Sequence, residues 1–407
     1  MKYSLAQSKA ISHVDGPMLV VAGPGSGKTA VITRRIKYLI ESAGVHPAEI
    51  LVITFTRAAA AEMKARFLSM SEGKDYPVRF STFHALFYWI IRKAYRLPSD
   101  VVISEQDKQN MSEEELKDLG KIDFDDMVIK CRELLTERPD ILERVRNMYR
   151  YILVDEFQDS SPMQYEILKL LAHPADNLFC VGDDDQSVYG FRGASPEIMR
   201  RMKREFRGTK LVKLTKNYRC DRLITKASAT VIAENKKRFK KKLVSASGKK
   251  GVVRIYELPD DSVQTEYLIR EIQSAKRMGI LYEEQAVIFR INAEGERLTY
   301  RLKKCGIPYA IRAGAEDTEL KETVSTGGVR LMTMHGAKGL EFDRVYIIDA
   351  VEGFTPYIKA KTVQEREEER RMFYVALTRA RHSLMIFAPQ KISGREYEKS
   401  RYLKRLL

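Results

Sequence analysis

The sequence is poor in cysteine and histidine and has no long hydrophobic run. Its 407 residues include four cysteines and six histidines, with no C-x-x-C pair and no metal-ligand spacing among the histidines. These absences argue against structural zinc and favour a reduced, cytoplasmic protein. Apolar runs such as 18–22 and 50–53 are far shorter than the roughly 18 residues of a membrane span. The first residues show no signal-peptide pattern, so we expect neither a membrane protein nor a secreted one.

Acidic residues are in the minority, and the positive excess is concentrated. The chain has 71 Lys and Arg against 55 Asp and Glu, a net charge of +16. Residues 200–250 hold 19 of the basic residues and three acidic ones, which accounts for the whole excess. A basic segment in an otherwise neutral chain favours a polyanionic partner, although a solvated basic helix face gives the same pattern.

Short apolar runs alternate with longer segments of helical periodicity. The runs predict strands at 18–22, 50–55, 78–81, 151–155, 178–182, 211–214, 252–256, 285–290, 309–312, 329–333, 344–348 and 383–388. Helices are expected at 29–42, 58–67, 162–172, 223–234, 265–278, 294–304 and 365–379. This alternation is typical of α/β proteins with parallel sheets covered by helices on both faces.

The number of strands predicts two domains rather than one. Twelve strands are many for a single open sheet, so we expect two α/β domains at 1–208 and 209–407. The segment 97–121 is polar and acidic and does not fit the alternation. It is expected to be a short insertion in the first domain.

A glycine-rich loop follows the first predicted strand and opens the first long helix. Residues 22–29 read Ala-Gly-Pro-Gly-Ser-Gly-Lys-Thr and contain Gly23, Gly25, Ser26, Gly27, Lys28 and Thr29. Glycines let backbone N–H groups turn toward a phosphate, and the helix N-terminus adds its dipole. Lys28 can reach the β- and γ-phosphates, and the Thr29 hydroxyl suits Mg²⁺. The loop therefore predicts a nucleoside triphosphate site, although Ala22 replaces the first glycine of the strict motif.

A second apolar strand ends in two acidic residues, Asp155 and Glu156. Asp155 is expected to hold the Mg²⁺ ion, and Glu156 to orient or deprotonate the attacking water. Two acids at a strand end often have no catalytic role. Beside a phosphate loop they predict hydrolysis of the nucleotide.

Further strings in the sequence resemble the UvrD/Rep/PcrA family of superfamily 1 DNA helicases. They are Gln7, Thr54-Phe55-Thr56, Thr82-Phe83-His84, 155–159, 182–193, Asn217-Tyr218-Arg219, 333–342 and 374–380. They occur in the family's order and cover nearly the whole chain. The resemblance implies two RecA-like P-loop domains with an ATP cleft between them, and ATP and Mg²⁺ as ligands.

The resemblance also implies roles in hydrolysis for three residues beyond the loop and the acid pair. Gln186 is expected to sense the γ-phosphate, and Arg219 and Arg379 to act as arginine fingers. The predicted catalytic set is then Lys28, Asp155, Glu156, Gln186, Arg219 and Arg379. For either arginine alone, the alternative is a surface salt bridge.

Recognition of the base and the ribose is assigned in the same way. The resemblance implies that Gln7 reads the adenine, that Tyr218 stacks on it and that Glu341 accepts a ribose hydroxyl. Arg35, beyond the phosphate loop, is a further candidate for nucleotide contact. For Tyr218 and Gln7, ordinary packing is the alternative.

The expected partner is single-stranded DNA. Candidate contacts are Phe55, Thr82, Phe83, His84, Tyr189, Phe191 and Arg192, with Thr333, His335 and Lys338 for backbone phosphates. Aromatic rings stack on any base, which suits a protein that must ignore sequence. Phe55 and Phe83 could instead be core residues, and Phe191 stands where the family usually has tryptophan. The basic run 236–242 is expected to attract phosphates without sequence preference.

Two departures from the family limit the functional prediction. The first of the two large insertions typical of the family is reduced here to about 97–121, and the second is absent. We therefore predict a compact ATP-dependent translocase on single-stranded DNA, or a 3′-to-5′ helicase. The alternative is a DNA-stimulated ATPase switch that works with a nuclease or a repair or defence partner and does not unwind DNA itself.

Overall fold

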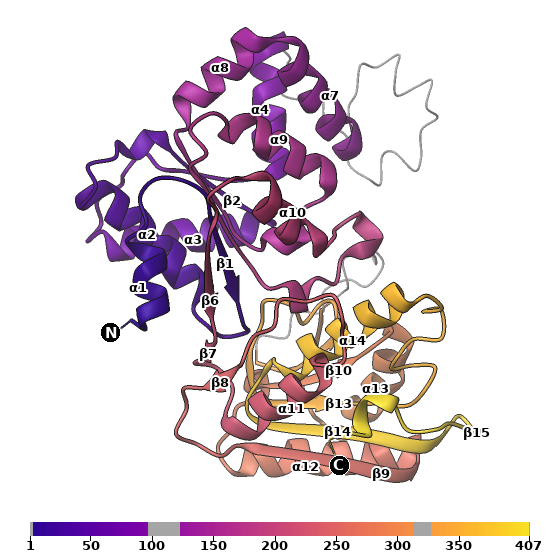
Figure 1. Cartoon of the computed structure of the whole chain (residues 1–407). Coiled ribbons are helices and arrows are strands. Elements are labelled where there is room, and N and C mark those ends of the chain that lie inside the picture. The colour runs from indigo at the N-terminus through magenta and orange to yellow at the C-terminus, as the bar shows by residue number, and fades with distance from the viewer. Residues whose placement is uncertain (1–2, 97–122, 313–326, 407) are drawn as a thin grey trace. The chain divides into compact units, whose positions relative to one another are not determined.

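The computed structural model describes residues 3–96, 123–312 and 327–406. The predicted insertion at 97–121 lies outside the described residues. The chain divides into two compact units, coloured in sequence order in Figure 1. The first comprises Met1–Ala22, Gly27–Asp184 and Tyr189–Leu214, and the second comprises Gly23–Ser26, Asp185–Val188 and Thr215–Leu407. The boundary predicted at 208/209 lies just before the last strand of the first unit.

The first unit is built on a parallel sheet with the strand order β3-β2-β4-β5-β1-β6 among the described residues. The strands are β1 Met18–Ala22, β2 Ile50–Thr54, β3 Arg79–Thr82, β4 Tyr151–Val154, β5 Leu178–Gly182 and β6 Lys210–Leu214. Every residue of β1, β2, β4 and β5 is buried. This burial explains why these strands are continuous apolar runs, since both faces of a parallel sheet are covered.

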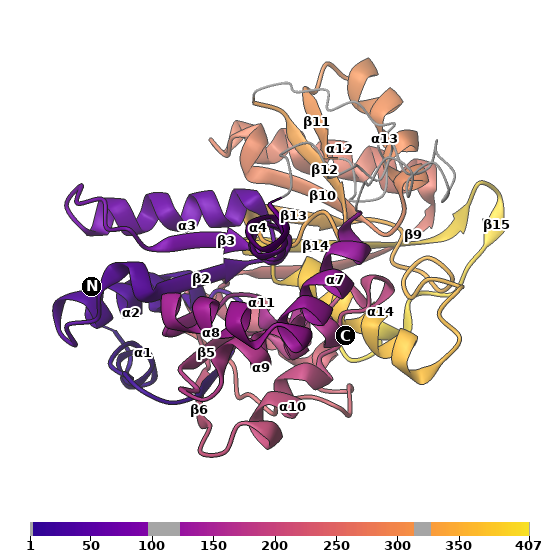
Figure 2. The same cartoon turned by 90° about the horizontal axis from the view of Figure 1, so that it is seen from above.

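Helices cover this sheet, and several of them begin at side-chain caps. They are α1 Leu5–Ile11, α2 Lys28–Glu41, α3 Arg57–Met70, α4 Phe83–Tyr95, α7 Phe124–Glu137, α8 Pro139–Met148, α9 Pro162–Ala172 and α10 Glu197–Glu205, with 3-10 turns at Pro47–Glu49, Phe157–Asp159, Asp184–Gln186 and Gly190–Arg192. The side chains of Thr56 and Ser161 accept backbone N–H bonds at the starts of α3 and α9, which satisfies donors that a helix start leaves without partners. Helix α3 lies along the edge strand β3 (Figure 2).

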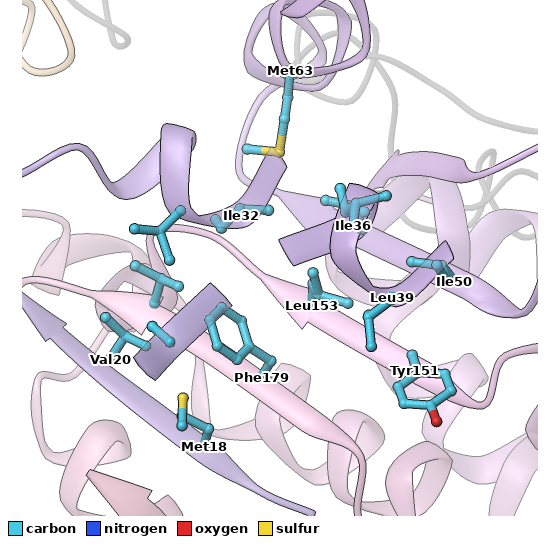
Figure 3. Packing of buried hydrophobic residues seen from close by; sticks show 14 of the residues in the cluster. Met18, Val20, Ile32, Ile36, Leu39, Ile50, Met63, Tyr151, Leu153 and Phe179 are labelled. Atoms are coloured by element: carbon cyan, nitrogen blue, oxygen red, sulfur yellow. The ribbon is translucent and has the colours of Figure 1, made fainter. Parts of the chain in front are cut away.

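The core of the first unit lies between the sheet and α2. Figure 3 shows Val20 of β1, Leu153 of β4 and Phe179 of β5 facing Ile32 and Ile36 of α2. All five side chains are buried. This packing fixes the start of α2, and with it the phosphate loop, at the carboxyl end of β1.

The second unit is built on another mainly parallel sheet with the order β11-β12-β10-β13-β14-β15, in which β9 also pairs with β14. Its strands are β9 Val252–Asp260, β10 Gln285–Phe289, β11 Tyr309–Arg312, β12 Val329–Thr333, β13 Phe342–Ile347, β14 Ala380–Ile392 and β15 Arg395–Glu396, and β7 Lys216–Asn217 pairs separately with β8 Val244–Ser245. The pair β14–β15 is antiparallel. Strands β9 and β14 run in parallel side by side along their length (Figure 1).

Four longer helices lie in the described part of this unit. They are α11 Arg222–Ile232, α12 Asp261–Arg277, α13 Asn292–Lys304 and α14 Val363–Leu377, with 3-10 turns at Tyr282–Glu284 and Arg401–Leu403. Thr362 caps α14 through a reciprocal bond pair with Glu365. The last six residues of this helix, Met372 to Leu377, are all buried in the unit.

The predicted strands and long helices are confirmed to within a few residues at their ends. The helices α4, α7, α8 and α10 were not among those expected. In α4 the buried residues are Phe83, Leu86, Phe87, Ile90 and Ile91, which is the spacing of an amphipathic helix. The aromatic density of this segment hides that pattern. Among the described residues, none of the helices is long and apolar enough to span a membrane.

Two buried carboxyl groups lie together in the second unit. Glu294 caps α13 by accepting the N–H groups of Arg290 and Ile291 on Oε2, at 3.0 and 2.7 Å. Its Oε1 has no hydrogen-bond partner among the described residues. Asp349 accepts bonds from Gln264 and Arg297 at 2.7 and 2.6 Å. Burial, and then the nearby Asp349 carboxylate, raises the pKa of Glu294 well above its usual range.

This arrangement predicts a pH-dependent stability that Glu294→Gln removes. A carboxyl whose folded-state pKa is raised stabilises fully below its unfolded pKa, and that stability falls as the pH rises toward the folded pKa. We expect Glu294→Gln to be more stable than the wild type at pH 8 by about 1–3 kcal/mol, and to lose less stability between pH 5 and pH 8. Urea unfolding at the two pH values measures this. Glu296→Gln, at an exposed position of the same helix, is the control and should match the wild type. A Glu294→Gln variant that is less stable at pH 8 would contradict the prediction.

Candidate nucleotide site and nucleic-acid contacts

The phosphate loop has the backbone that its glycines predict. Gly25 and Gly27 have φ angles of 60° and 81°, in the left-handed region that side chains disfavour. Ser26 Oγ donates to the Gly23 carbonyl at 2.7 Å. Gly27 precedes the 14-residue helix α2 and makes no side-chain cap, so the N–H groups of the first turn face outward without a competing side chain. This cradle fits a phosphate anion.

Lys28 of the loop forms an ion pair with Glu156 in the first unit. Lys28 Nζ lies 2.9 Å from both Glu156 Oε1 and Oε2, and the Lys28 side chain is 13% exposed. Burial would lower the pKa of Lys28, but the carboxylates of Glu156 and Asp155 outweigh it and raise this pKa. Lys28 is therefore a charged amine held over the predicted acid pair.

Asp155 and Glu156 leave the end of β4 in different conformations. Asp155 is buried, and its Oδ1 accepts the Glu156 N–H at 2.9 Å. Glu156 has a φ of 48°, a conformation that non-glycine residues adopt only when their surroundings enforce it. Burial, and then the Glu156 carboxylate, raises the pKa of Asp155 to about 7. A carboxylate, and the hydroxyl of Thr29 next to Lys28 in the sequence, are oxygen donors of the kind that Mg²⁺ prefers, so these residue types fit this ion.

Gln158 joins the acid pair to the next strand, and the sequence reasoning did not single it out. Its Nε2 donates to Glu156 Oε2 at 2.6 Å, and its Oε1 accepts the Asp183 N–H at 2.8 Å. A Cβ on Gly182 would lie 2.5 Å from Gln158 Oε1. Only glycine therefore allows this approach. The signal was present in the string 155–159, where the glutamine follows the acids by two residues.

The structure places the two other nucleotide candidates of the first unit differently. Gln7 is buried in α1, accepts the Ser4 N–H at 2.9 Å, and has its Nε2 3.1 Å from the position of a Cβ on Gly27. It is thus next to the phosphate loop. Arg35 is 1% exposed, stacks over the Phe179 ring at 4.4 Å, and donates to the Val14 carbonyl at 3.0 Å. This position favours a packing role for Arg35 over contact with a nucleotide.

In the second unit, Gln186 lies against Arg379. Arg379 Nη2 is 3.3 Å from Gln186 Oε1, and the Lys338 Nζ donates to the Gln186 carbonyl at 2.9 Å. Arg379 is 1% exposed and also donates to the carbonyls of Val375 and Leu340. The predicted γ-phosphate sensor and one predicted arginine finger are therefore in contact. Lys338, expected at a DNA phosphate, here holds the sensor segment.

Arg219 and Glu341 form an ion pair in the same unit. Arg219 Nε lies 2.5 Å from Glu341 Oε2, and Arg381 Nη1 lies 3.5 Å from Glu341 Oε1. Burial would raise the pKa of Glu341, but Arg219 and Arg381 lower it. Tyr218 is 48% exposed, and its N–H donates to the Gly25 carbonyl at 2.8 Å.

Three of the predicted DNA contacts form an aromatic cluster in the first unit. The rings of Phe55 and Tyr189 are stacked at 5.5 Å with an interplanar angle of 8°, and Phe191 meets Tyr189 edge-on at 6.0 Å. Phe191 is 52% exposed. The side chain of Arg192 lies outside the described part of the structure. An exposed ring on a stacked pair is the geometry of a base-stacking platform.

The remaining candidates lie at strand ends and in turns. Thr82 caps α4 by accepting the Ala85 N–H at 3.2 Å, and Phe83 is 3% exposed and packs on Phe87. Phe83 is thus a core residue in this structure. His84 is half-buried and contacts the Phe124 ring at 5.0 Å.

At the end of β12, Thr333 is buried and accepts the Gly336 N–H at 3.1 Å. The half-buried His335 follows in the same turn. Thr333 therefore shapes this turn, which presents His335 next to the strand end.

Comparison with known proteins decides the family. The family model of the UvrD/REP helicase N-terminal domain matches residues 4–117 and 103–207. The model of the UvrD-like helicase C-terminal domain matches residues 212–316 and 312–391. The chain belongs to the UvrD/REP helicase family. The predicted family, the α/β fold of RecA-like P-loop domains and the enzyme class of ATP-hydrolysing helicases are confirmed.

Curated relatives within this helicase family are longer than the chain. It is 27% identical to the putative ATP-dependent DNA helicase YjcD of Bacillus subtilis, over 98% of this chain and 80% of that protein. It is 32% and 31% identical to the ATP-dependent DNA helicases PcrA of Staphylococcus epidermidis and Staphylococcus aureus, over 78% of this chain. The chain spans about half the length of the PcrA proteins, 51%. The YjcD alignment extends over 611 residues, so that helicase carries segments that this chain lacks.

The approach of Gln158 to Gly182 generates a prediction for this UvrD/REP-family site. Gly182→Ala would place a methyl group 2.5 Å from Gln158 Oε1 and 3.2 Å from the Gln158 backbone nitrogen. We expect a loss of about 1–3 kcal/mol in unfolding free energy, because the contact includes backbone that cannot turn away. Gly248→Ala is the matched control, since nothing lies within 4 Å of its Cβ position. Denaturant unfolding of both variants measures the difference, and equal stability would contradict the contact.

Proposed function

We propose that this chain is an ATP-driven translocase on single-stranded DNA that moves with 3′-to-5′ polarity. The observation that carries the proposal is the ion pair of Lys28 with Glu156, which joins the phosphate loop to the acid pair in one unit. The relatives' names support ATP and DNA as ligands, and the polarity is drawn from the family resemblance. The described part of the chain offers no large insertion that would engage duplex DNA. Translocation is therefore proposed ahead of unwinding.

Binding of the triphosphate begins with an exchange of partners at Lys28. In the ion pair, Lys28 neutralises Glu156; when ATP enters the loop, the amine turns to the β- and γ-phosphates. Gly25 and Gly27 leave backbone N–H groups facing the same anion. The Thr29 hydroxyl and the Asp155 carboxylate would hold Mg²⁺, which would supply positive charge to stabilise the transferring phosphoryl group.

Once Lys28 has turned to the phosphates, the Glu156 carboxylate can act as a base. Its carboxylate stays oriented because Gln158 donates to Oε2 at 2.6 Å. Glu156 then accepts a proton from the attacking water or aligns that water with the γ-phosphate. The strained backbone at Glu156 supports this role, because such conformations persist where the surroundings hold a functional side chain.

Arginines of the second unit are proposed to complete the site during the cycle. We propose that Arg219 and Arg379 neutralise charge on the γ-phosphate during hydrolysis. Their carboxylate and amide partners, Glu341 and Gln186, would then be released to the ribose and the γ-phosphate. As these arginine–phosphate contacts form and break in each cycle, the two units would bind the DNA tightly in turn.

The proposed role of Glu156 predicts a loss of turnover without a loss of binding. Glu156→Gln keeps the shape of the side chain but cannot accept a proton, so we expect ATP hydrolysis to fall by about 100-fold or more. Binding of a fluorescent ATP analogue should persist, since Lys28 no longer has a carboxylate competitor. Glu62→Gln, at an exposed position of the first unit, is the control and should keep the wild-type rate. Full hydrolysis by Glu156→Gln would overturn the assignment.

The DNA-binding role of the aromatic cluster predicts the response to single strands. We expect single-stranded DNA to stimulate ATP hydrolysis more than duplex DNA or RNA. Phe191→Ala should raise the DNA concentration for half-maximal stimulation by about 5- to 150-fold, the equivalent of one lost stacking contact. Tyr300→Ala, which removes an exposed ring on α13, is the control. An unchanged half-maximal concentration in Phe191→Ala would contradict the platform.

Displacement of a protein block tests movement directly. Movement in the 3′-to-5′ direction removes a block from the 5′ end of an oligonucleotide and leaves one at the 3′ end in place. A 3′-tailed duplex in the same assay shows whether unwinding accompanies movement. DNA-stimulated hydrolysis with neither displacement nor unwinding would replace the translocase by a switch subunit.

A further inference from the structure

The basic run 236–242 does not act as one surface. Four of its lysines are exposed: Lys236, Lys237, Lys240 and Lys242. The other two basic side chains are largely or wholly enclosed, with exposed fractions of 10% for Arg238 and 0% for Lys241. The expectation that the whole run attracts DNA phosphates is therefore wrong for Lys241, because a fully buried cation has no access to a phosphate, and Arg238 is largely enclosed beside it.

Both buried cations pair with Asp185. Arg238 Nε lies 2.7 Å from Asp185 Oδ1, and Lys241 Nζ lies 2.9 Å from Asp185 Oδ2. The Asp185 side chain is 0% exposed. Burial would raise the pKa of Asp185, but Lys241 and Arg238 lower it. All three groups are thus charged and depend on one another, since an uncompensated charge in the interior is strongly unfavourable.

Asp185 is the residue before Gln186, the predicted γ-phosphate sensor. Gln186 is itself held at its carbonyl by Lys338 and at its side chain by Arg379. The segment Asp185–Val188 therefore has cations on both sides: Arg238 and Lys241 at Asp185, and Lys338 and Arg379 at Gln186. A single step along the backbone transmits any shift of Asp185 to Gln186.

We propose that Arg238 and Lys241 are positioning residues that hold Gln186 in place through Asp185. This inference rests on the proposed function, because it concerns the response of Gln186 to ATP. It divides the basic run into two parts with different tasks. The exposed lysines attract DNA phosphates, whereas the buried pair fixes the sensor segment. Residues outside every recognised motif are thereby assigned to the hydrolytic machinery.

The two tasks make opposite predictions for neighbouring lysines. Lys241→Met removes the buried charge and keeps most of the volume, and we expect maximal DNA-stimulated hydrolysis to fall by about 10- to 100-fold, the effect of a misplaced catalytic group. The salt dependence of single-stranded DNA binding should stay as in the wild type. Lys242→Met removes an exposed charge next to it, and its salt slope should become less negative by about 0.7. Hydrolysis rates and DNA affinities at several salt concentrations measure both effects.

A double variant separates positioning from stability. If Lys241 acts through Asp185, the maximal rate of Asp185→Asn/Lys241→Met should equal that of Asp185→Asn alone, because the second change has nothing left to position. Two losses that multiply would show that Lys241 acts independently of Asp185 and would overturn the inference. Should Lys241→Met not fold, Arg238→Gln at the more accessible end of the network takes its place with the same expected rate loss.

The outcomes also separate this inference from the proposed function. A wild-type protein without DNA-stimulated hydrolysis contradicts the proposed function itself. If DNA stimulates the wild type, and Lys241→Met hydrolyses ATP at the same rate but binds DNA with a less negative salt slope, then Lys241 is a phosphate contact. That result would refute the positioning role and leave the proposed function intact.

Discussion

The close approach of Gln158 to Gly182 is the constraint on which the catalytic edge of the first unit depends. Parallel strands β4 and β5 end side by side, and the missing side chain of Gly182 lets the Gln158 amide lie between them. That amide binds the Asp183 N–H on one side and the Glu156 carboxylate on the other. Glu156 in turn meets Lys28 at the start of α2. The Gln158 side chain therefore joins the ends of β4 and β5, and Glu156 extends this link to α2.

Much of the fold could be predicted because buried parallel strands are continuous apolar runs. The strand β4, Tyr151–Val154, is buried at every position and is bounded in sequence by Arg150 and the acid pair. The helix predicted at 162–172 also matches α9, which Ser161 caps in the structure. The helix α4 was not expected, because its buried and its partly buried positions both carry aromatic residues, so the sequence shows no contrast between a polar and an apolar face.

Site residues were predictable where the chemistry needs a residue type at a fixed place, and less so where packing decides. The phosphate loop and Glu156 required no knowledge of packing. Arg35 and Phe83 were assigned to ligands, yet Arg35 is enclosed by Phe179 and Val14 and Phe83 packs on Phe87. The charge count predicted an exposed Lys241 for a related reason. A run of lysines does not reveal that one of them pairs with a buried aspartate, Asp185, far away in the sequence.

The Lys28–Glu156 pair provides the phosphate loop with a counter-ion from within the protein. Any anion that binds Lys28 must compete with this carboxylate, and a singly charged anion such as chloride brings less charge to that competition than a triphosphate does. A triphosphate carries several negative charges on many oxygens, so it can displace the Glu156 carboxylate from Lys28. For the proposed hydrolysis, the same pairing means that Glu156 is neutralised by Lys28 until a triphosphate takes the amine from it.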